Sequence, residues 1–208
     1  RFPAGTLIPL TRVALVEYPW RLTEGPRRRC CLSPGSARRG NHGFLSSRKK
    51  QLPSRVRYGA MLEVPALAET LDILLPKLDF ISIGTNDLTQ FLFAADRAEP
   101  RLAERYDWLS PAILRFIRRV VRECKAHNVG VSVCGEMGGR PLEALALIGI
   151  GVERLSITPA AVGTIKAMVR SLDVGAANLM MEALLDRPVD KLRTAITDWA
   201  KEQQVEIG

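Results

Sequence analysis

Glu63, Asp87 and Cys134 carry groups that could ligate a metal or transfer a proton, and each ends a short apolar segment. Such a segment, closed by a glycine or proline, is typical of a strand buried on both faces in a parallel sheet. The carboxyl ends of parallel strands share one edge of the sheet, where ligands bind in α/β folds. We therefore expect two carboxylates and a thiol in one pocket. The segments are Ala60–Val64, Phe80–Ile83 and Val129–Val133.

This combination of groups favours a phosphate ligand held by a metal ion. Two carboxylates suit a hard divalent cation, and Mg²⁺ usually takes one or two of them and leaves its other positions to water and substrate oxygens. Asn86 precedes Asp87, and Arg97 lies in the polar loop that follows. Both could hold a phosphate, Arg97 through two parallel hydrogen bonds. Glycines after Cys134 leave backbone N–H groups open to an anion.

Each of these residues also has an ordinary structural explanation, which the spacing alone leaves open. Glu63 could be a solvated or paired carboxylate, and Arg97 a solvated loop residue. The pair Asn86–Asp87 after a glycine is typical of a turn or a helix N-cap. A cysteine at the end of an apolar strand, such as Cys134, is often a small core residue.

Alternating strands and amphipathic helices must position the three strand ends. A fourth strand is expected at Arg154–Ile157, and Ser110 is expected to cap a long helix that reaches about His127. Strands that alternate with helices at these lengths predict βαβ units and a parallel sheet, hence the α/β class. The other expected helices contain Leu67–Leu75, Leu88–Ala94, Pro141–Ile148 and Val162–Leu172, with a final helix from Arg187 to about Gln203.

The first part of the chain differs in composition from the rest. Residues 1–57 contain 13 Lys and Arg against 2 Asp and Glu, whereas residues 58–208 contain 17 against 20. One strand is expected at 12–18, and the Arg-, Gly-, Ser- and Pro-rich stretch 25–40 is expected to be disordered. We interpret this segment as out-of-frame text of a GC-rich coding sequence. A nucleic-acid-binding tail is the disfavoured alternative, because few aromatic residues accompany the charge.

Composition excludes several classes of protein. No apolar run approaches the ~20 residues that span a bilayer, and no signal peptide is visible, so no membrane association is expected. The spacing of the four cysteines indicates neither a zinc site nor a disulfide framework, which favours a cytoplasmic setting. The chain begins with Arg1 instead of methionine, and we expect a fragment. The cysteines are Cys30, Cys31, Cys124 and Cys134.

Five motifs resemble the phosphoenolpyruvate (PEP)-utilising enzymes, and most closely their PEP–protein phosphotransferase branch, enzyme I of the phosphotransferase system. The likeness runs from about Leu52 to Leu172, and the tail after it resembles the nitrogen-related paralogue. The motifs are Gly59–Pro65 (GAMLEVP), Ser82–Gln90 (SIGTNDLTQ), Asp96–Arg97, Ser110–Leu114 (SPAIL) and Cys134–Met137 (CGEM).

The resemblance implies a fold and a role for each candidate residue. The family's substrate domain is a (β/α)8 TIM barrel, of which this chain would carry the carboxyl-terminal half. Glu63 and Asp87 would ligate Mg²⁺, and Asn86, Asp87 and Arg97 would bind the substrate. Cys134 would be the catalytic acid that protonates the enolate to give pyruvate. Metal and arginine would neutralise the charge on the transferred phosphoryl group.

The resemblance also implies partners. In the family the phosphoryl group passes to a histidine on a swivelling domain, then to a small histidine-containing phosphocarrier protein, and the barrel forms a homodimer. Neither His42 nor His127 lies in a motif like that of the swivelling domain. A half barrel leaves open sheet edges and an uncovered apolar face. We therefore expect the chain alone to be inactive and prone to associate.

These inferences divide the chain into three parts and leave two alternatives. The expected parts are an irregular basic segment (1–51), the second half of the barrel (52–173) and a helical appendage (174–208). One alternative is a fragment of a pyruvate phosphate dikinase or PEP synthase, although no nucleotide-binding domain is visible. The other is a non-catalytic remnant that dimerises or binds nucleic acid.

Overall fold

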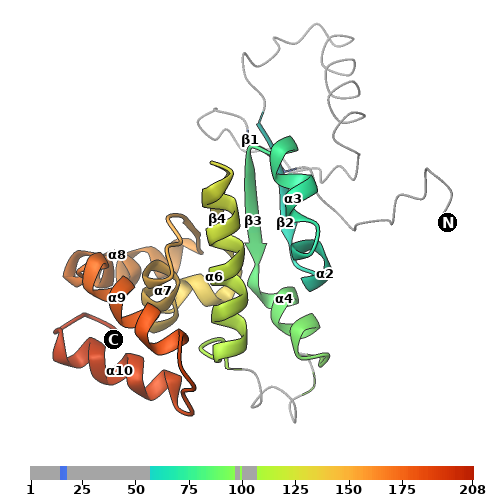
Figure 1. Ribbon diagram of the computed structural model, residues 1–208. Helices are drawn as coiled ribbons and strands as arrows, with labels where there is room; N and C mark the ends of the chain where they lie inside the picture. Colours follow the sequence, from blue (N-terminus) through green and yellow to red (C-terminus); the bar gives the residue numbers. More distant parts are fainter. Residues whose placement is uncertain (1–14, 18–56, 97–98, 100–106) are drawn as a thin grey trace, which may run out of the picture.

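The computed structural model describes the backbone of residues 15–17 together with residues 57–96, 99 and 107–208, and its strands form one sheet (Figure 1). Strand order is β1-β2-β3-β4-β5. The pairs β2–β3, β3–β4 and β4–β5 are parallel, whereas β1 pairs antiparallel with β2. The predicted α/β class with a parallel sheet is therefore confirmed. The strands are β1 (Leu15–Glu17), β2 (Arg57–Leu62), β3 (Phe80–Gly84), β4 (Gly130–Cys134) and β5 (Leu155–Ser156).

Strand β3 lies inside the sheet, and all five of its residues are buried. This confirms the prediction of a strand covered on both faces. Strand β2 begins at Arg57, three residues before the start expected at Ala60, because β1 and β3 pair with its first residues. The backbone strand at 15–17 falls within the strand expected at 12–18, whose other residues lie outside the described residues.

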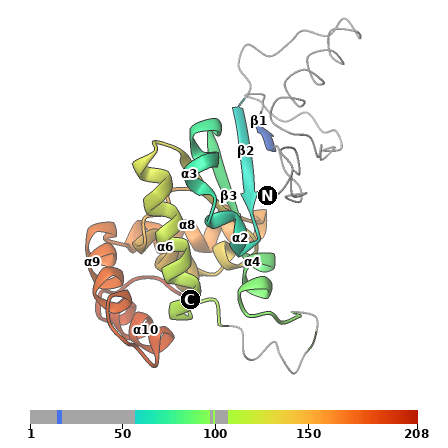
Figure 2. The same cartoon turned by 45° about the vertical axis from the view of Figure 1, so that its right-hand side comes forward.

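Helices α3 and α6 lie along the same side of β2 and β3 (Figure 2). In α6 the Ser110 side chain accepts a hydrogen bond from the N–H of Ile113, as the predicted N-cap should. The described α-helices are α2 (Pro65–Ala68), α3 (Leu71–Leu74), α4 (Thr85–Leu92), α6 (Pro111–Ala126), α7 (Pro141–Gly149), α8 (Val162–Ser171), α9 (Val174–Leu185) and α10 (Leu192–Glu202). Short 3-10 turns are η1 (Leu75–Lys77), η2 (Glu136–Gly139) and η3 (Pro159–Ala161).

Helix α4 begins earlier than the apolar pattern predicts. The expected start was Leu88, which left Asn86 and Asp87 in the turn before the helix. The helix instead starts at Thr85 with Gly84 as its N-cap, and both residues lie in its first turn. The reason is that Thr85–Asp87 carry no apolar residue, so apolar periodicity could not report these three positions.

The two faces of the sheet have different compositions. Ile81, Ile83 and Val133 belong to the apolar core formed with the helices. Residues that pair across parallel strands share a face, and Ser82 pairs with Ser132 while Gly84 pairs with Cys134. The second face therefore carries small and polar side chains at these positions, and Cys134 belongs to it.

The carboxyl-terminal helices α9 and α10 share the core of the preceding elements. Apolar residues of both helices lie in the same buried cluster as those of α6 and α7. The expected final helix is confirmed as α10 over a shorter range, whereas α9 was not individually predicted. No helix within the described ranges is long and apolar enough to cross a membrane. The contributing residues are Ala177, Met181, Leu185, Leu192, Ile196 and Ala200.

Candidate functional site

The Glu63 side chain bridges the carboxyl ends of β2 and β3. A Cβ atom built on Gly84 would lie 2.6 Å from Glu63 Cγ and 2.8 Å from its Oε1. These separations are shorter than van der Waals contact, so the carboxylate occupies space that only a glycine leaves open. Glu63 thus reaches the N-cap of α4, whose first turn holds Asp87.

A second glycine joins the end of β4 to the first turn of α4. Gly135 has φ of 112°, a conformation that L-residues rarely adopt. A Cβ atom built there would lie 2.5 Å from Thr85 Oγ1 and 3.1 Å from Asn86 Oδ1. Both the backbone angle and the close approach therefore require glycine at this position.

Asn86 is held by the loop that follows β4. Its Oδ1 accepts a hydrogen bond from the N–H of Glu136 at 3.1 Å, and its Nδ2 donates to Glu136 Oε1 at 3.5 Å. The Thr85 hydroxyl donates to the carbonyl oxygen of Cys134 at 3.1 Å. Because an amide oxygen accepts and an amide nitrogen donates, these bonds fix the orientation of the Asn86 side chain.

Cys134 is half-buried on the polar face of the sheet, and its thiol has a perturbed acidity. Burial raises its pKa, the negative charge of Glu63 raises it further, and a hydrogen bond from Ser82 opposes the rise. The Ser82 hydroxyl donates to Cys134 Sγ at 3.4 Å. The thiol therefore keeps its proton at neutral pH, which is the form that an acid catalyst needs.

The structure brings most of the predicted residues together. Glu63 acts on Cys134 electrostatically, and Asn86 contacts the loop that begins just after Cys134. Asp87 is partly exposed in the same helical turn as Asn86. These residues share the edge at which β2, β3 and β4 end, beside the start of α4 (Figure 1). Arg97 lies outside the described residues.

Sequence reasoning did not assign roles to several residues that shape this edge. Ser82 is the polar residue within an otherwise apolar strand, and that interruption was a usable signal. Thr85 and Glu136 had no such signal, since their hydrogen bonds span 49 and 50 positions of the chain. Gly84 was recognised only as the end of a strand, because its contact with Glu63 is tertiary.

The donors at this edge fit the chemistry of a magnesium ion. Glu63 and Asp87 offer hard carboxylate oxygens, and the cradle at Gly84 admits the Glu63 carboxylate. Within the described ranges no group of three or more His, Cys, Asp or Glu side chains is arranged to hold a metal. An ion bound by two carboxylates would complete its coordination with water and ligand oxygens, as Mg²⁺ commonly does.

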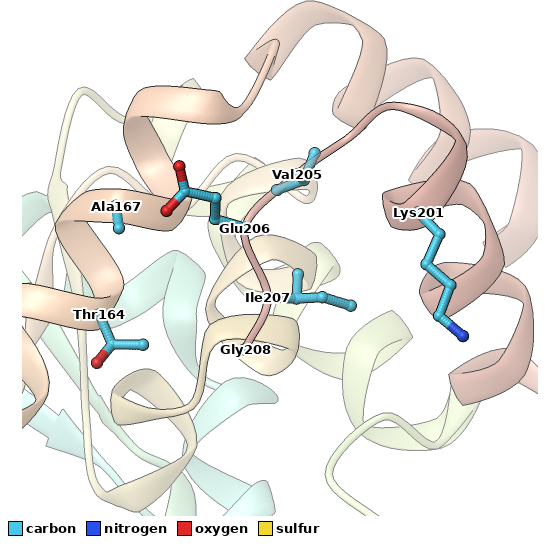
Figure 3. A pocket seen from close by; sticks show the side chains of 7 residues that line it. All are labelled: Thr164, Ala167, Lys201, Val205, Glu206, Ile207 and Gly208. Carbon is cyan, nitrogen blue, oxygen red and sulfur yellow. The ribbon is translucent and has the colours of Figure 1, made fainter.

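A cavity of about 470 Å³ lies elsewhere, between α8, α10 and the last residues of the chain (Figure 3). None of the predicted site residues lines it. It combines one lysine and one glutamate with apolar and small residues, so it offers neither the metal donors nor the thiol of the strand ends. Its lining residues are Thr164, Ala167, Lys201, Val205, Glu206, Ile207 and Gly208.

Comparison with known proteins identifies a domain and several relatives. The sequence model described as "PEP-utilising enzyme, PEP-binding domain" matches residues 41–174. The expected boundaries at 52 and 173 were not tested independently and stay predictions. Domains of this family are of the TIM-barrel type, and the four parallel strands β2–β5 agree with part of such a barrel.

Three relatives illustrate the range of the similarity. The chain is 44% identical over 127 residues to a "Multiphosphoryl transfer protein" of Xanthomonas campestris pv. campestris, covering 61% of this chain and 15% of the relative. It is 41% identical over 124 residues to a "Phosphoenolpyruvate-protein phosphotransferase" of Cupriavidus necator, covering 56% and 21%. It is 42% identical over 115 residues to a "Phosphoenolpyruvate synthase" of Pyrococcus furiosus, covering 55% and 14%.

The aligned part of this chain spans only 14% to 23% of the length of such relatives. The family match nevertheless covers more than half of the chain and includes every strand end described above. The chain therefore belongs to the PEP-utilising enzymes, a family of PEP-dependent phosphotransferases, through its PEP-binding domain.

Proposed function

We propose that this chain supplies PEP-binding and proton-donating residues of a PEP–protein phosphotransferase. That enzyme transfers the phosphoryl group of PEP to a protein histidine and releases pyruvate. The observation that supports it most is the Glu63 carboxylate lying over Gly84 at the start of α4, where its charge also acts on the thiol of Cys134. A metal-ligating group, a phosphate-binding turn and an acid thus share one edge.

In this proposal the acidic residues and the amide bind the substrate. Glu63 and Asp87 hold Mg²⁺, which when bound neutralises charge on the phosphoryl oxygens. The Nδ2 group of Asn86 donates to the phosphate, and this bond replaces its hydrogen bond of 3.5 Å to Glu136 Oε1. Arg97 adds a bidentate contact with the phosphate.

Cys134 completes the reaction by giving its proton to the enolate. The S–H bond breaks and its electron pair stays on sulfur. A C–H bond forms at the terminal carbon, using the electron pair of the carbon–carbon double bond, and pyruvate results. Burial favours this role, because a thiol with a raised pKa is protonated when the enolate forms.

The phosphoryl acceptor is a histidine outside this PEP-binding domain, and a histidine-containing phosphocarrier protein receives the group next. The homodimer and the cytoplasmic setting belong to the same proposal. So does the nitrogen-related branch, which rests on the sequence after Leu172 alone. We expect the purified chain to release no pyruvate from PEP, and detectable release would contradict that expectation.

Metal-dependent ligand binding tests the proposal without requiring turnover. Calorimetric titration of the purified chain with PEP in the presence of Mg²⁺ should give binding that disappears in Asp87→Asn and Glu63→Gln. The matched control is Asp72→Asn, which removes an exposed aspartate from the first turn of α3. Equal PEP affinity in Asp87→Asn and Asp72→Asn would refute the assignment of Asp87.

A PEP synthase or dikinase is the second candidate, favoured by the relative from Pyrococcus furiosus. PEP binding does not separate the two, because both bind the same substrate. The coding DNA on either side of this segment does, because a synthase or dikinase also needs a nucleotide-binding domain. The same DNA, translated in its other two frames over residues 1–50, should give barrel-like sequence if the out-of-frame interpretation is correct.

A further inference from the structure

We propose that Ser82 is a positioning residue, which holds the sulfur of Cys134 so that the thiol proton points away from β3 and toward the substrate. This inference rests on the proposed function, in which Cys134 is the acid. Ser82 itself does not touch the reacting atoms. It acts through the hydrogen bond of 3.4 Å that its hydroxyl donates to Cys134 Sγ.

The strand register explains why these two side chains meet. Gly84 is the direct partner of Cys134 across β3 and β4, and Ser82 lies two residues earlier on the same face. Gly84 has no side chain, and Glu63 fills the space above it. The hydroxyl that reaches the thiol from β3 is therefore that of Ser82.

Burial makes this bond persistent. Ser82 is 5% exposed, and a buried hydroxyl needs a hydrogen-bond partner to offset its lost hydration. Because the Ser82 hydroxyl occupies the side of the sulfur that faces β3 as a donor, the thiol proton is left for the other sides.

The same bond assists the step in which the thiol loses its proton. The negative charge of the Glu63 carboxylate opposes formation of the thiolate that remains. A hydroxyl forms a stronger hydrogen bond with a thiolate than with a thiol. Ser82 therefore stabilises the thiolate that proton transfer leaves on Cys134. Loss of the hydroxyl should make Cys134 a weaker acid.

Ser132 provides a matched control on the neighbouring strand. It is the direct register partner of Ser82 and lies on the same face. Its hydroxyl donates to the carbonyl oxygen of Ile81 at 3.4 Å, not to the thiol. Ser132→Ala therefore removes the same atom from the same face while leaving the Ser82 bond to Cys134 intact.

Alkylation of the full chain by iodoacetamide between pH 6.5 and 10 tests the proposal, with each cysteine followed separately by peptide mass spectrometry. In Ser82→Ala the profile of Cys134 should move to higher pH, with a rate at pH 8 lower by about threefold to tenfold. Ser82→Thr, which keeps the hydroxyl, should restore the parental profile, and Ser132→Ala should not change it. An unchanged profile in Ser82→Ala, or an equal shift in Ser132→Ala, would overturn the proposal.

Two further readouts keep the test decisive. Cys124 is fully buried, so its protection from alkylation reports that a variant is folded. If Ser82→Ala exposes Cys124, the Ser82→Cys variant is used instead, because a thiol is similar in size to a hydroxyl and is a far weaker donor. The alkylation of Cys134 should then slow as expected for Ser82→Ala. A parental profile in Ser82→Cys would then overturn the proposal. The assay uses neither PEP nor metal, so its outcome is independent of the binding test of the proposed function.

Discussion

The strand-end site and the outer helical layer, formed by α6, α7, α9 and α10, use charged and polar residues in opposite ways. At the site, Glu63 and Cys134 are partly exposed, and glycines leave room for Glu63 beside Gly84 and for Thr85 and Asn86 beside Gly135. In the outer layer, arginines join helices that are distant in sequence through ion pairs with carboxylates. Polar groups at the site remain accessible to a ligand, whereas those of the outer layer are already neutralised by the protein.

Two arginines of the outer layer make ion pairs in which one side chain is largely buried. Arg193 of α10 contacts Glu143 of α7 at 2.6 Å and Asp107 at 2.6 Å, and the Glu143 side chain is only 3% exposed. Arg118 of α6 contacts Glu182 of α9 at 2.8 Å, and its own side chain is 11% exposed. Removing one partner of a buried pair leaves an uncompensated charge, so these residues stabilise the fold.

The comparison shows where substitutions should affect stability and where they should affect ligand binding. The geometry of the site requires that Gly84 and Gly135 have no side chain. The stability of the outer layer depends on its ion pairs. Substitutions that strand a buried charge in the outer layer should lower the free energy of unfolding, and mild substitutions at the site should weaken metal or substrate binding in a folded chain.

Arg193→Ala should have the largest effect on stability. It strands the buried Glu143 carboxylate, and the expected loss is about 2–4 kcal/mol of unfolding free energy, the lower figure reflecting the exposed part of Arg193. Urea denaturation followed by circular dichroism measures it. Arg119→Ala is the control: its pair with Glu69 is exposed, so its loss of stability should be clearly smaller. Equal losses in the two variants would contradict the distinction.

Gly135→Ala should cost about 1–3 kcal/mol, because alanine strains the backbone at φ of 112° and its Cβ displaces Thr85. The same urea titration measures the change. Gly163→Ala in α8 is the control, since nothing lies within 4 Å of its Cβ and alanine favours a helix. It should be neutral or stabilise the chain, and a loss equal to that of Gly135→Ala would show that strain at Gly135 is not the cause.

The buried Cys124 predicts a pH dependence of stability. Burial raises its pKa to about 12, whereas an exposed thiol ionises near pH 8.5. Because the folded pKa is the higher one, its stabilising contribution is complete below about pH 8.5 and is lost as the pH rises toward 12. At pH 10 the parent should therefore lose about 1–2 kcal/mol more than Cys124→Ala does. Urea midpoints of both proteins at pH 7 and 10 test this, and parallel declines would contradict it.

Gly84→Ala should have the smallest effect on stability and a clear effect on binding. Its φ of −87° suits any residue, so the expected loss of stability is below about 1 kcal/mol. Its Cβ would displace the Glu63 carboxylate, and affinity for a metal should fall about tenfold or more. Electron paramagnetic resonance of Mn²⁺ binding measures that affinity. Unchanged Mn²⁺ binding would show that Glu63 does not hold the metal from the observed position.

Much of the scaffold was predictable because it depends on local patterns. The apolar residues of Phe80–Gly84 and the spacing of apolar positions after Ser110 predicted β3 and α6. Helix α9 escaped individual prediction because Val174 and Leu179 are exposed apolar residues, which obscure the boundary between its two faces. Its buried face is defined by packing on α6 and α7, which no local pattern reports.

The sequence by itself predicted that Glu63, Asp87 and Cys134 lie at or just beyond the ends of apolar strands and that these ends share one edge of a parallel sheet, because apolar runs and the alternation of strands with helices are visible as local patterns. It also carried the family's motifs. Only the tertiary structure decided that Ser82 donates to the thiol, that Glu136 holds Asn86 and that Glu63 needs the space above Gly84. These contacts depend on strand register and on missing Cβ atoms, and both are set when distant segments pack together.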